Sequence, residues 1–232
     1  MMQSMGMFFP LFWDPTMVLV LPGLLLAMWA QFRVQAAYRE WSQVFAKKGV
    51  TGADVARTIT AGQCAVQEVP GELTDHFDPR TNSLHLSSGV FRSDSVAALG
   101  IAAHEAGHAL QHREGYFPLA LRASLVPVAN IGSWLAFPLF FIGMIIHQGW
   151  LIQVGMLLFT GALVFSLVTL PVEFDASSRA LRILESSGIL APDEMVGARK
   201  VLRAAALTYI ASTAMAALEL LRMFILSSGR RS

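Results

Sequence analysis

The stretch that organises this chain is His104-Glu105-Ala106-Gly107-His108, which has the pattern H-E-x-x-H. On an α-helix, residues i and i+4 lie on the same face, so both imidazoles can reach one metal ion. Glu105 follows the first histidine and can act as a base on a metal-bound water. Zinc suits this site because it binds neutral imidazole and carboxylate, and a catalytic zinc keeps three protein ligands plus water.

The residues around the motif predict a helix from about Ser93 to Arg113 that ends near Gly115. Ser93-Asp94-Ser95 offers N-cap side chains and an acidic group in the first turn. No proline follows until Pro118. Two histidines and a glutamate among small apolar residues are costly to bury unless they are paired or bind a metal. The alternative is a helix whose histidines are satisfied by hydrogen bonds in the core.

The composition is that of a membrane protein. The chain has 232 residues, of which 54% are hydrophobic and 14% charged, whereas a soluble domain carries roughly 25% charged residues. The net charge of +1 gives no sign of a nucleic-acid partner. The single cysteine, Cys64, excludes an internal disulfide and a cysteine-based zinc cluster. We therefore expect a mainly α, polytopic helical protein whose partner is the lipid bilayer.

The apolar runs predict about four membrane spans. They are an N-terminal anchor in residues 1–32, two transmembrane helices in 124–170 and a C-terminal membrane helix in 204–232. The anchor is expected to be retained, because the start of the chain lacks the basic residues and cleavage site of a signal peptide. Between the spans lie a polar part with a β-hairpin and the H-E-x-x-H helix, 33–123, and a helical part, 171–203.

Short strands are predicted between Ala65 and Ser88, with turn sequences at Pro70-Gly71 and at 78–82. They indicate a small antiparallel sheet directly before the H-E-x-x-H helix. The edge of such a sheet can pair with an extended peptide. The alternative is a hairpin with a structural role alone.

The distribution of lysine and arginine predicts the orientation. These residues gather between the first and second spans and between the third and fourth, whereas the break at His147 has none. The positive-inside rule then puts both polar parts in the cytoplasm. We expect a multi-pass protein of the cell (inner) membrane whose active site faces the cytoplasm. His104 and Glu173 would lie on the same side and could share one metal.

Candidates for the third ligand are Glu173, Asp175, His112 and Glu185. Pro171 is predicted to end an apolar helix, so Glu173 would begin the element that completes the site. Asp175 lies about 200° further around a helix, so it and Glu173 cannot both face one metal. His112 is about 12 Å from His104 along the helix, too far for one ion.

Four segments carry a family resemblance: HEAGHALQH (104–112), LTDHFDPRTNSLHLS (73–87), PVEFDASSRAL (171–181) and GARKVLRAAALTYIA (197–211). They resemble the YugP-type membrane zinc metallopeptidases, relatives of the gluzincins with a site similar to that of HtpX-like proteases. The resemblance implies zinc, the ligands His104, His108 and Glu173, and Glu105 as base. HtpX-like enzymes commonly have an aspartate four residues after the ligand glutamate, which orients a ligand. Ser177 stands at that position here, which leaves Asp175 or Asp75 to orient the histidines.

The expected function is that of a zinc metalloendopeptidase (EC 3.4.24 type) acting on membrane-associated or unfolded proteins. A zinc-activated water would attack the peptide bond, with Glu105 as general base. Candidates for stabilising the oxyanion are Tyr209, Arg179 and His76, and His112 is a candidate for contacting a ligand from behind. A membrane scaffold or binding protein with a structural zinc is the alternative. An intramembrane site is disfavoured because the apolar run before His104 is shorter than a span.

Overall fold

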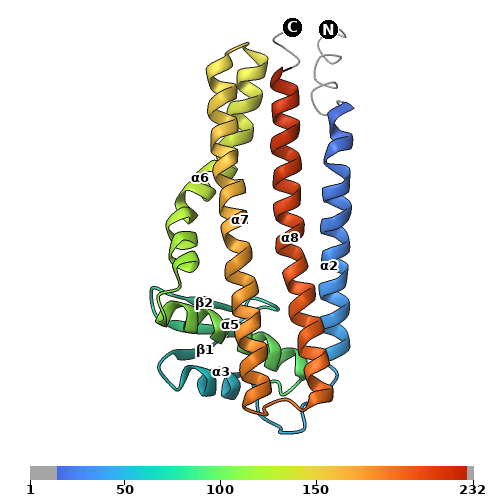
Figure 1. Ribbon diagram of the computed structural model, residues 1–232, viewed down its shortest axis with the longest axis vertical. Helices are drawn as coiled ribbons and strands as arrows, with labels where there is room; N and C mark the ends of the chain where they lie inside the picture. The colour runs from blue at the N-terminus through green and yellow to red at the C-terminus, as the bar shows by residue number, and fades with distance from the viewer. Residues whose placement is uncertain (1–14, 229–232) are drawn as a thin grey trace. The chain divides into compact units, whose positions relative to one another are not determined.

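A computed structural model describes residues 15–228, which are mainly helical (Figure 1). Within these residues the chain forms a short 3-10 helix, seven α-helices and a three-stranded sheet. In chain order these are η1 (Pro15–Leu19), α2 (Leu21–Trp41), α3 (Gly52–Thr60), β1 (Ala65–Val69), β2 (His76–Asp78), β3 (Ser83–Ser87), α4 (Ser88–Phe91), α5 (Val96–Arg113), α6 (Phe117–Ile145), α7 (Gly149–Ser186) and α8 (Pro192–Ser228).

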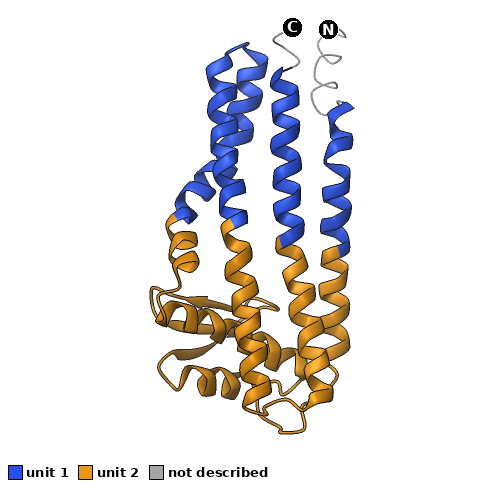
Figure 2. Cartoon of the chain, in the orientation of Figure 1, with its two compact units in different colours: residues 1–29, 125–167, 210–232 blue, residues 30–124, 168–209 orange. Residues whose placement is uncertain are grey.

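The chain divides into two compact units, coloured separately in Figure 2. The first comprises residues 1–29, 125–167 and 210–232, and the second comprises residues 30–124 and 168–209. Helices α2, α6, α7 and α8 each contribute residues to both units. The sheet, α3, α4 and α5 belong wholly to the second unit, so every element around the H-E-x-x-H motif lies there.

Within residues 15–228, three helices are long and apolar enough to cross a membrane, namely α6, α7 and α8. They correspond to the last three of the four expected spans. The start of the expected N-terminal anchor, residues 1–14, lies outside the described residues. η1 and the first half of α2 hold the rest of the anchor. Helix α2 continues to Trp41, and Gln31, Arg33 and Gln35 make its second half polar.

Small residues let the helices of the first unit pack closely. A Cβ atom on Gly132 of α6 would lie 2.7 Å from the Leu158 carbonyl oxygen of α7, and one on Gly155 of α7 would lie 2.7 Å from the Ala136 oxygen. Such contacts are typical of helix packing in membranes, where backbones must approach for van der Waals attraction. The same unit buries an ion pair between Arg222 and Glu219 at 2.9 Å.

Helix α5 ends where its sequence predicts, but it begins at Val96 rather than near Ser93, so Asp94 lies before the helix and not in its first turn. Ser95 is the N-cap, and its hydroxyl accepts a hydrogen bond from the Ala98 amide at 3.3 Å. The helix ends at Arg113, and Gly115 follows with φ +65°, a conformation that favours glycine. Leu99 of α5 and Leu84 and Leu86 of β3 are fully buried in one core, so α5 is fixed against the sheet as well as against α3.

The sheet is mixed, with strand order β1-β3-β2, so the prediction of an antiparallel sheet was wrong in part. β2 and β3 form the expected antiparallel hairpin, whereas β1 pairs with β3 in parallel. Parallel strands need a crossover between them, and here the segment containing β2 makes that crossover. β2 begins only at His76, because Leu73 has φ +53° in the preceding turn.

The expectation that an apolar helix stops at Pro171 was also wrong. α7 runs without a break from Gly149 to Ser186 and contains Pro171. A proline inside a helix loses one backbone hydrogen bond and clashes with the preceding turn. Val172 and Ala176, which follow the proline, are completely buried, and this packing outweighs the lost bond. Glu173 therefore lies in the interior of a long helix and does not begin a new one.

Candidate metal centre

The side chains of His104, His108 and Glu173 converge in the second unit. One potential ligand atom from each lies within 4.8 Å of the other two. The Oε2 atom of Glu173 is 3.3 Å from His104 Nε2 and 3.7 Å from His108 Nε2. The two imidazole rings stand edge to face, with centroids 4.8 Å apart. The structure thus brings α5 and α7 together at the three residues that the sequence pointed to.

Glycine and alanine at the helix crossing make this convergence sterically possible. A Cβ atom on Gly107 of α5 would lie 2.7 Å from the carbonyl oxygen of Ala176 in α7. Any larger residue at position 107 would push the two backbones apart. Ala103, Ala106 and Ala176 are fully buried around this contact. His104 and His108 lie on either side of this contact on α5, and Glu173 lies three residues before it on α7.

The two oxygen atoms of the Glu173 carboxylate have different surroundings. Its side chain is nearly buried, and Oε1 accepts a hydrogen bond from Arg122 at 3.0 Å. Among residues 15–228, no hydrogen-bond donor satisfies Oε2, because the close approach of His104 Nε2 lacks hydrogen-bond geometry. A buried acceptor without a partner is costly. A cation between Oε2 and the two imidazoles would satisfy it, and this donor set suits zinc.

Each histidine is held from behind at its second ring nitrogen. His104 Nδ1 is 3.1 Å from the hydroxyl of Ser177, and His108 Nδ1 is 3.0 Å from the side-chain oxygen of Gln111. Contacts of this kind set the orientation of metal-binding histidines. Ser177, which stands where HtpX-like enzymes have an aspartate, therefore contacts His104 itself.

Glu105 lies beside the ligands with an unpaired carboxylate. It is half-buried and makes no hydrogen bond or ion pair within the described part of the chain. Its charge acts on His108 and on Asp75. Burial lowers the pKa of His108, but its interaction with the nearby Glu173 carboxylate and the charge of Glu105 outweigh burial and raise it. Burial raises the pKa of Asp75, and the charge of Glu105 raises it further. Hydrogen bonds from Ser87 act in the opposite direction but are outweighed.

Of the three oxyanion candidates, Tyr209 of α8 is the one close to the carboxylates of Glu173 and Glu105. Its hydroxyl interacts electrostatically with Glu173 and Glu105. Arg179 is engaged in ion pairs with Asp175 and Glu114. His76 stacks on His85 across the β2–β3 hairpin, with ring centroids 4.7 Å apart.

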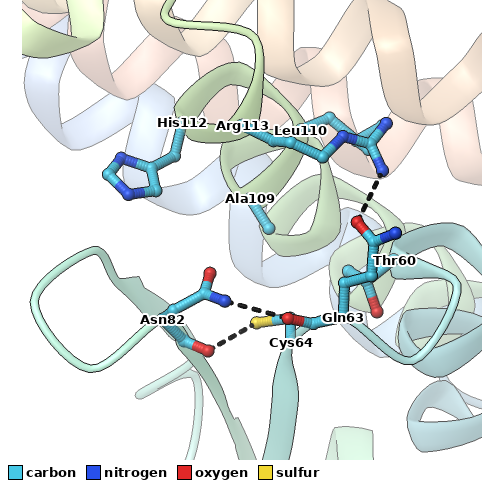
Figure 3. A pocket seen from close by; sticks show the side chains of 8 residues that line it. All are labelled: Thr60, Gln63, Cys64, Asn82, Ala109, Leu110, His112 and Arg113. Atoms are coloured by element: carbon cyan, nitrogen blue, oxygen red, sulfur yellow. Dashed lines mark hydrogen bonds between the residues drawn. The ribbon is translucent and has the colours of Figure 1, made fainter.

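The other candidate ligands lie away from the three convergent side chains. His112 contacts the ring of Phe77 and, with Arg113 and Gln63, lines a separate pocket of about 360 Å³ (Figure 3). Glu185 forms an exposed ion pair with Arg199 at 3.2 Å. Asp175 accepts a hydrogen bond from Gln111 and so reaches His108 only through that side chain.

Gln111 and Arg122 were not identified as site residues from the sequence. Each carried a signal. Gln111 is a polar residue three positions after His108, on the same side of a helix that is otherwise apolar there. Arg122 is an isolated charge near the start of a long apolar helix, and such a charge is typically paired or functional.

Comparison with known proteins bears on this site. A family described as "Putative neutral zinc metallopeptidase" matches residues 16–228 of the chain. A Bacillus subtilis (strain 168) protein named "Putative membrane protease YugP" is 44% identical over 217 residues, which cover 91% of this chain and 96% of the relative. No solved structure matches.

Proposed function

The chain belongs to this family of zinc metallopeptidases, and on that premise we propose that it hydrolyses peptide bonds at a zinc held by His104, His108 and Glu173. The cofactor of the family is Zn²⁺. Bound zinc would polarise a water molecule and lower its pKa toward about 7. The observation that carries the proposal is the meeting of two imidazole nitrogens at the partnerless carboxylate oxygen of Glu173.

Two of the three distances between donor atoms are close to those around a tetrahedral ion. Ligand atoms about 2.0–2.1 Å from zinc at tetrahedral angles lie roughly 3.3–3.4 Å apart. The distance from Glu173 Oε2 to His104 Nε2 is 3.3 Å, and to His108 Nε2 it is 3.7 Å. Arg122 retains the other carboxylate oxygen, so Glu173 would offer one oxygen and leave a position for water.

Glu105 is assigned the role of general base. Its carboxylate follows the first histidine on α5 and is free of hydrogen bonds within residues 15–228, so it can accept a proton from the attacking water. It would then deliver that proton to the leaving amine. Tyr209 is the favoured donor to the oxyanion, because its hydroxyl interacts electrostatically with both Glu105 and Glu173. An unpaired Glu105 also disfavours the alternative of a structural zinc, since a structural site needs no base.

We propose membrane-associated or unfolded proteins as substrates, cleaved internally. A relative named as a membrane protease supports this class. β2 is an edge strand of the sheet and packs against α5. Its free edge could pair with an extended peptide close to the motif.

Metal removal tests the function directly. The purified protein should degrade an unfolded substrate such as denatured casein, lose this activity in excess chelator, and regain it when zinc is returned. The zinc content should fall with the activity in chelator and return with it when zinc is added, because the reaction requires the metal at the three ligands. Stoichiometric zinc without cleavage of unfolded or membrane-protein substrates would favour the structural-zinc alternative.

We further propose that α2, with the residues before it, forms a fourth span. Its exposed side chains include an apolar stripe at helical spacing, formed by Leu21, Leu25, Met28 and Phe32. Such a stripe suits lipid, and the opposite face of α2 packs on α8 through Gly23 and Met215. With four spans, the two basic segments fall on one side of the membrane, for which we propose the cytoplasm.

Cysteine labelling tests this orientation. In a Cys64→Ser background, Lys47→Cys and Arg199→Cys should be protected from a membrane-impermeant thiol reagent in intact cells, whereas His147→Cys should react. Lysed cells provide the control, because all three positions should then be labelled. Labelling of positions 47 and 199 from outside intact cells would contradict the orientation.

A further inference from the structure

Gln111 lies between His108 of α5 and the backbone of α7. Its side chain is 0% exposed, and its three polar contacts are all within hydrogen-bond distance. The oxygen Oε1 lies 3.0 Å from His108 Nδ1. The nitrogen Nε2 lies 2.8 Å from the Val172 carbonyl oxygen and 2.8 Å from Asp175 Oδ2. The amide therefore links a ligand on α5 to two acceptors on α7.

These contacts dictate which way the amide faces. A backbone carbonyl cannot donate a hydrogen bond, so the side-chain group that faces Val172 must be the NH₂. Reversing the amide would set its oxygen against both the Val172 carbonyl and the Asp175 carboxylate. The orientation follows from the network, which is the proper basis for assigning an amide. Oε1 must then face His108.

The amide orientation in turn fixes the tautomer of His108. An amide oxygen only accepts, so His108 Nδ1 must carry the proton. In a neutral imidazole the other nitrogen then has a free lone pair, and that nitrogen, Nε2, is the atom 3.7 Å from Glu173 Oε2. His104 differs, because the Ser177 hydroxyl at its Nδ1 can either donate or accept and selects no tautomer.

An ion-pair chain holds the Gln111 amide on its far side. Asp175 pairs with Arg179, which pairs in turn with Glu114 at the end of α5. The Arg179 guanidinium also lies over the Tyr116 ring, 5.7 Å from its centroid. These ion pairs connect α7 to α5, so they hold in place Asp175, which accepts a hydrogen bond from Gln111.

We propose that Gln111 is a positioning residue that keeps the proton of His108 on Nδ1 and turns its Nε2 lone pair toward the metal. The inference rests on the proposed zinc peptidase function. It assigns a role to a residue that touches neither metal nor substrate. It also connects Asp175 to His108 through Gln111 without making Asp175 a ligand.

The test is the zinc affinity of Gln111→Met, which preserves side-chain length and removes the amide. Loss of such an outer partner typically weakens metal binding by about 10–100-fold. We expect a loss in that range, measured by competition with a chromophoric chelator. Ser177→Ala is the matched variant on the other histidine, and it should lose less because its hydroxyl selects no tautomer. Thermal unfolding of the metal-free proteins checks that each variant folds.

A second measurement on the wild-type protein does not depend on any variant folding. With ¹⁵N-histidine labelling of the zinc-loaded protein, the His108 Nδ1 proton should be observed and should exchange slowly with solvent. Wild-type zinc affinity in a folded Gln111→Met protein, or a rapidly exchanging His108 Nδ1 proton, would overturn the inference and leave the peptidase proposal intact. Failure of the wild-type protein to bind zinc would instead overturn the proposed function.

Discussion

Glu105→Gln protein should bind zinc as the wild type does and cleave peptides about 10²–10⁴-fold more slowly, the range that a general base contributes. The amide that replaces the carboxylate has nearly the same size but cannot accept a proton from water. Because Glu105 makes no hydrogen bond or ion pair within residues 15–228, the change breaks no contact there and should leave folding intact. Cleavage assays paired with metal analysis of the same samples measure both effects.

The matched control for this variant is Glu185→Gln. Glu185 was also a candidate ligand, but it is exposed and pairs with Arg199 at the surface. This control should keep both zinc and cleavage. Equal cleavage by wild type and Glu105→Gln would refute hydrolysis with Glu105 as base, whatever the metal content.

Glu173→Ala should lower zinc affinity by more than the roughly 10–100-fold that follows loss of an outer partner. It removes one of three ligands and leaves the Arg122 cation without its carboxylate. Glu173→Gln is the companion variant, because its amide oxygen can still accept from Arg122 while the ligand charge is lost. Chelator competition on both variants separates the loss of a ligand from a general loss of stability.

Asp175→Ala and His112→Ala serve as controls for that experiment. His112 packs against Phe77 beside a different pocket. Asp175 shares the Gln111 amide with the Val172 carbonyl, which would remain. Both variants should therefore keep most of the zinc. If Asp175→Ala loses zinc while Glu173→Ala binds it normally, the third ligand is Asp175.

The elements defined by short-range signals could be predicted from the sequence. Ser95 caps α5 and Gly115 follows its end, because caps and glycine turns depend on neighbouring residues alone. The histidines and Glu105 followed from their spacing. Glu173 was identified on weaker grounds, since nothing local shows which acidic residue a distant helix will face. The prediction that it begins a new helix was wrong, because it lies inside α7.

Features that depend on packing between distant segments could not be predicted. Pro171 looked like a helix end, but the burial of Val172 and Ala176 keeps α7 continuous. The parallel pairing of β1 with β3 depends on a crossover that turn residues do not encode. The role of Gln111 depends on hydrogen-bond partners about sixty positions later, Val172 and Asp175. No local pattern in the sequence connects these residues.

The position of Glu173 inside α7 has a consequence for biosynthesis. His104 and His108 leave the ribosome well before Glu173, and α6 and most of the apolar part of α7 are made in between. A nascent chain that stops short of α7 holds two ligands and an unpartnered Arg122. On the proposed ligand set, such a chain has no complete site. Peptidase activity would then begin only after α6 and α7 have been synthesised and α7 has docked on α5.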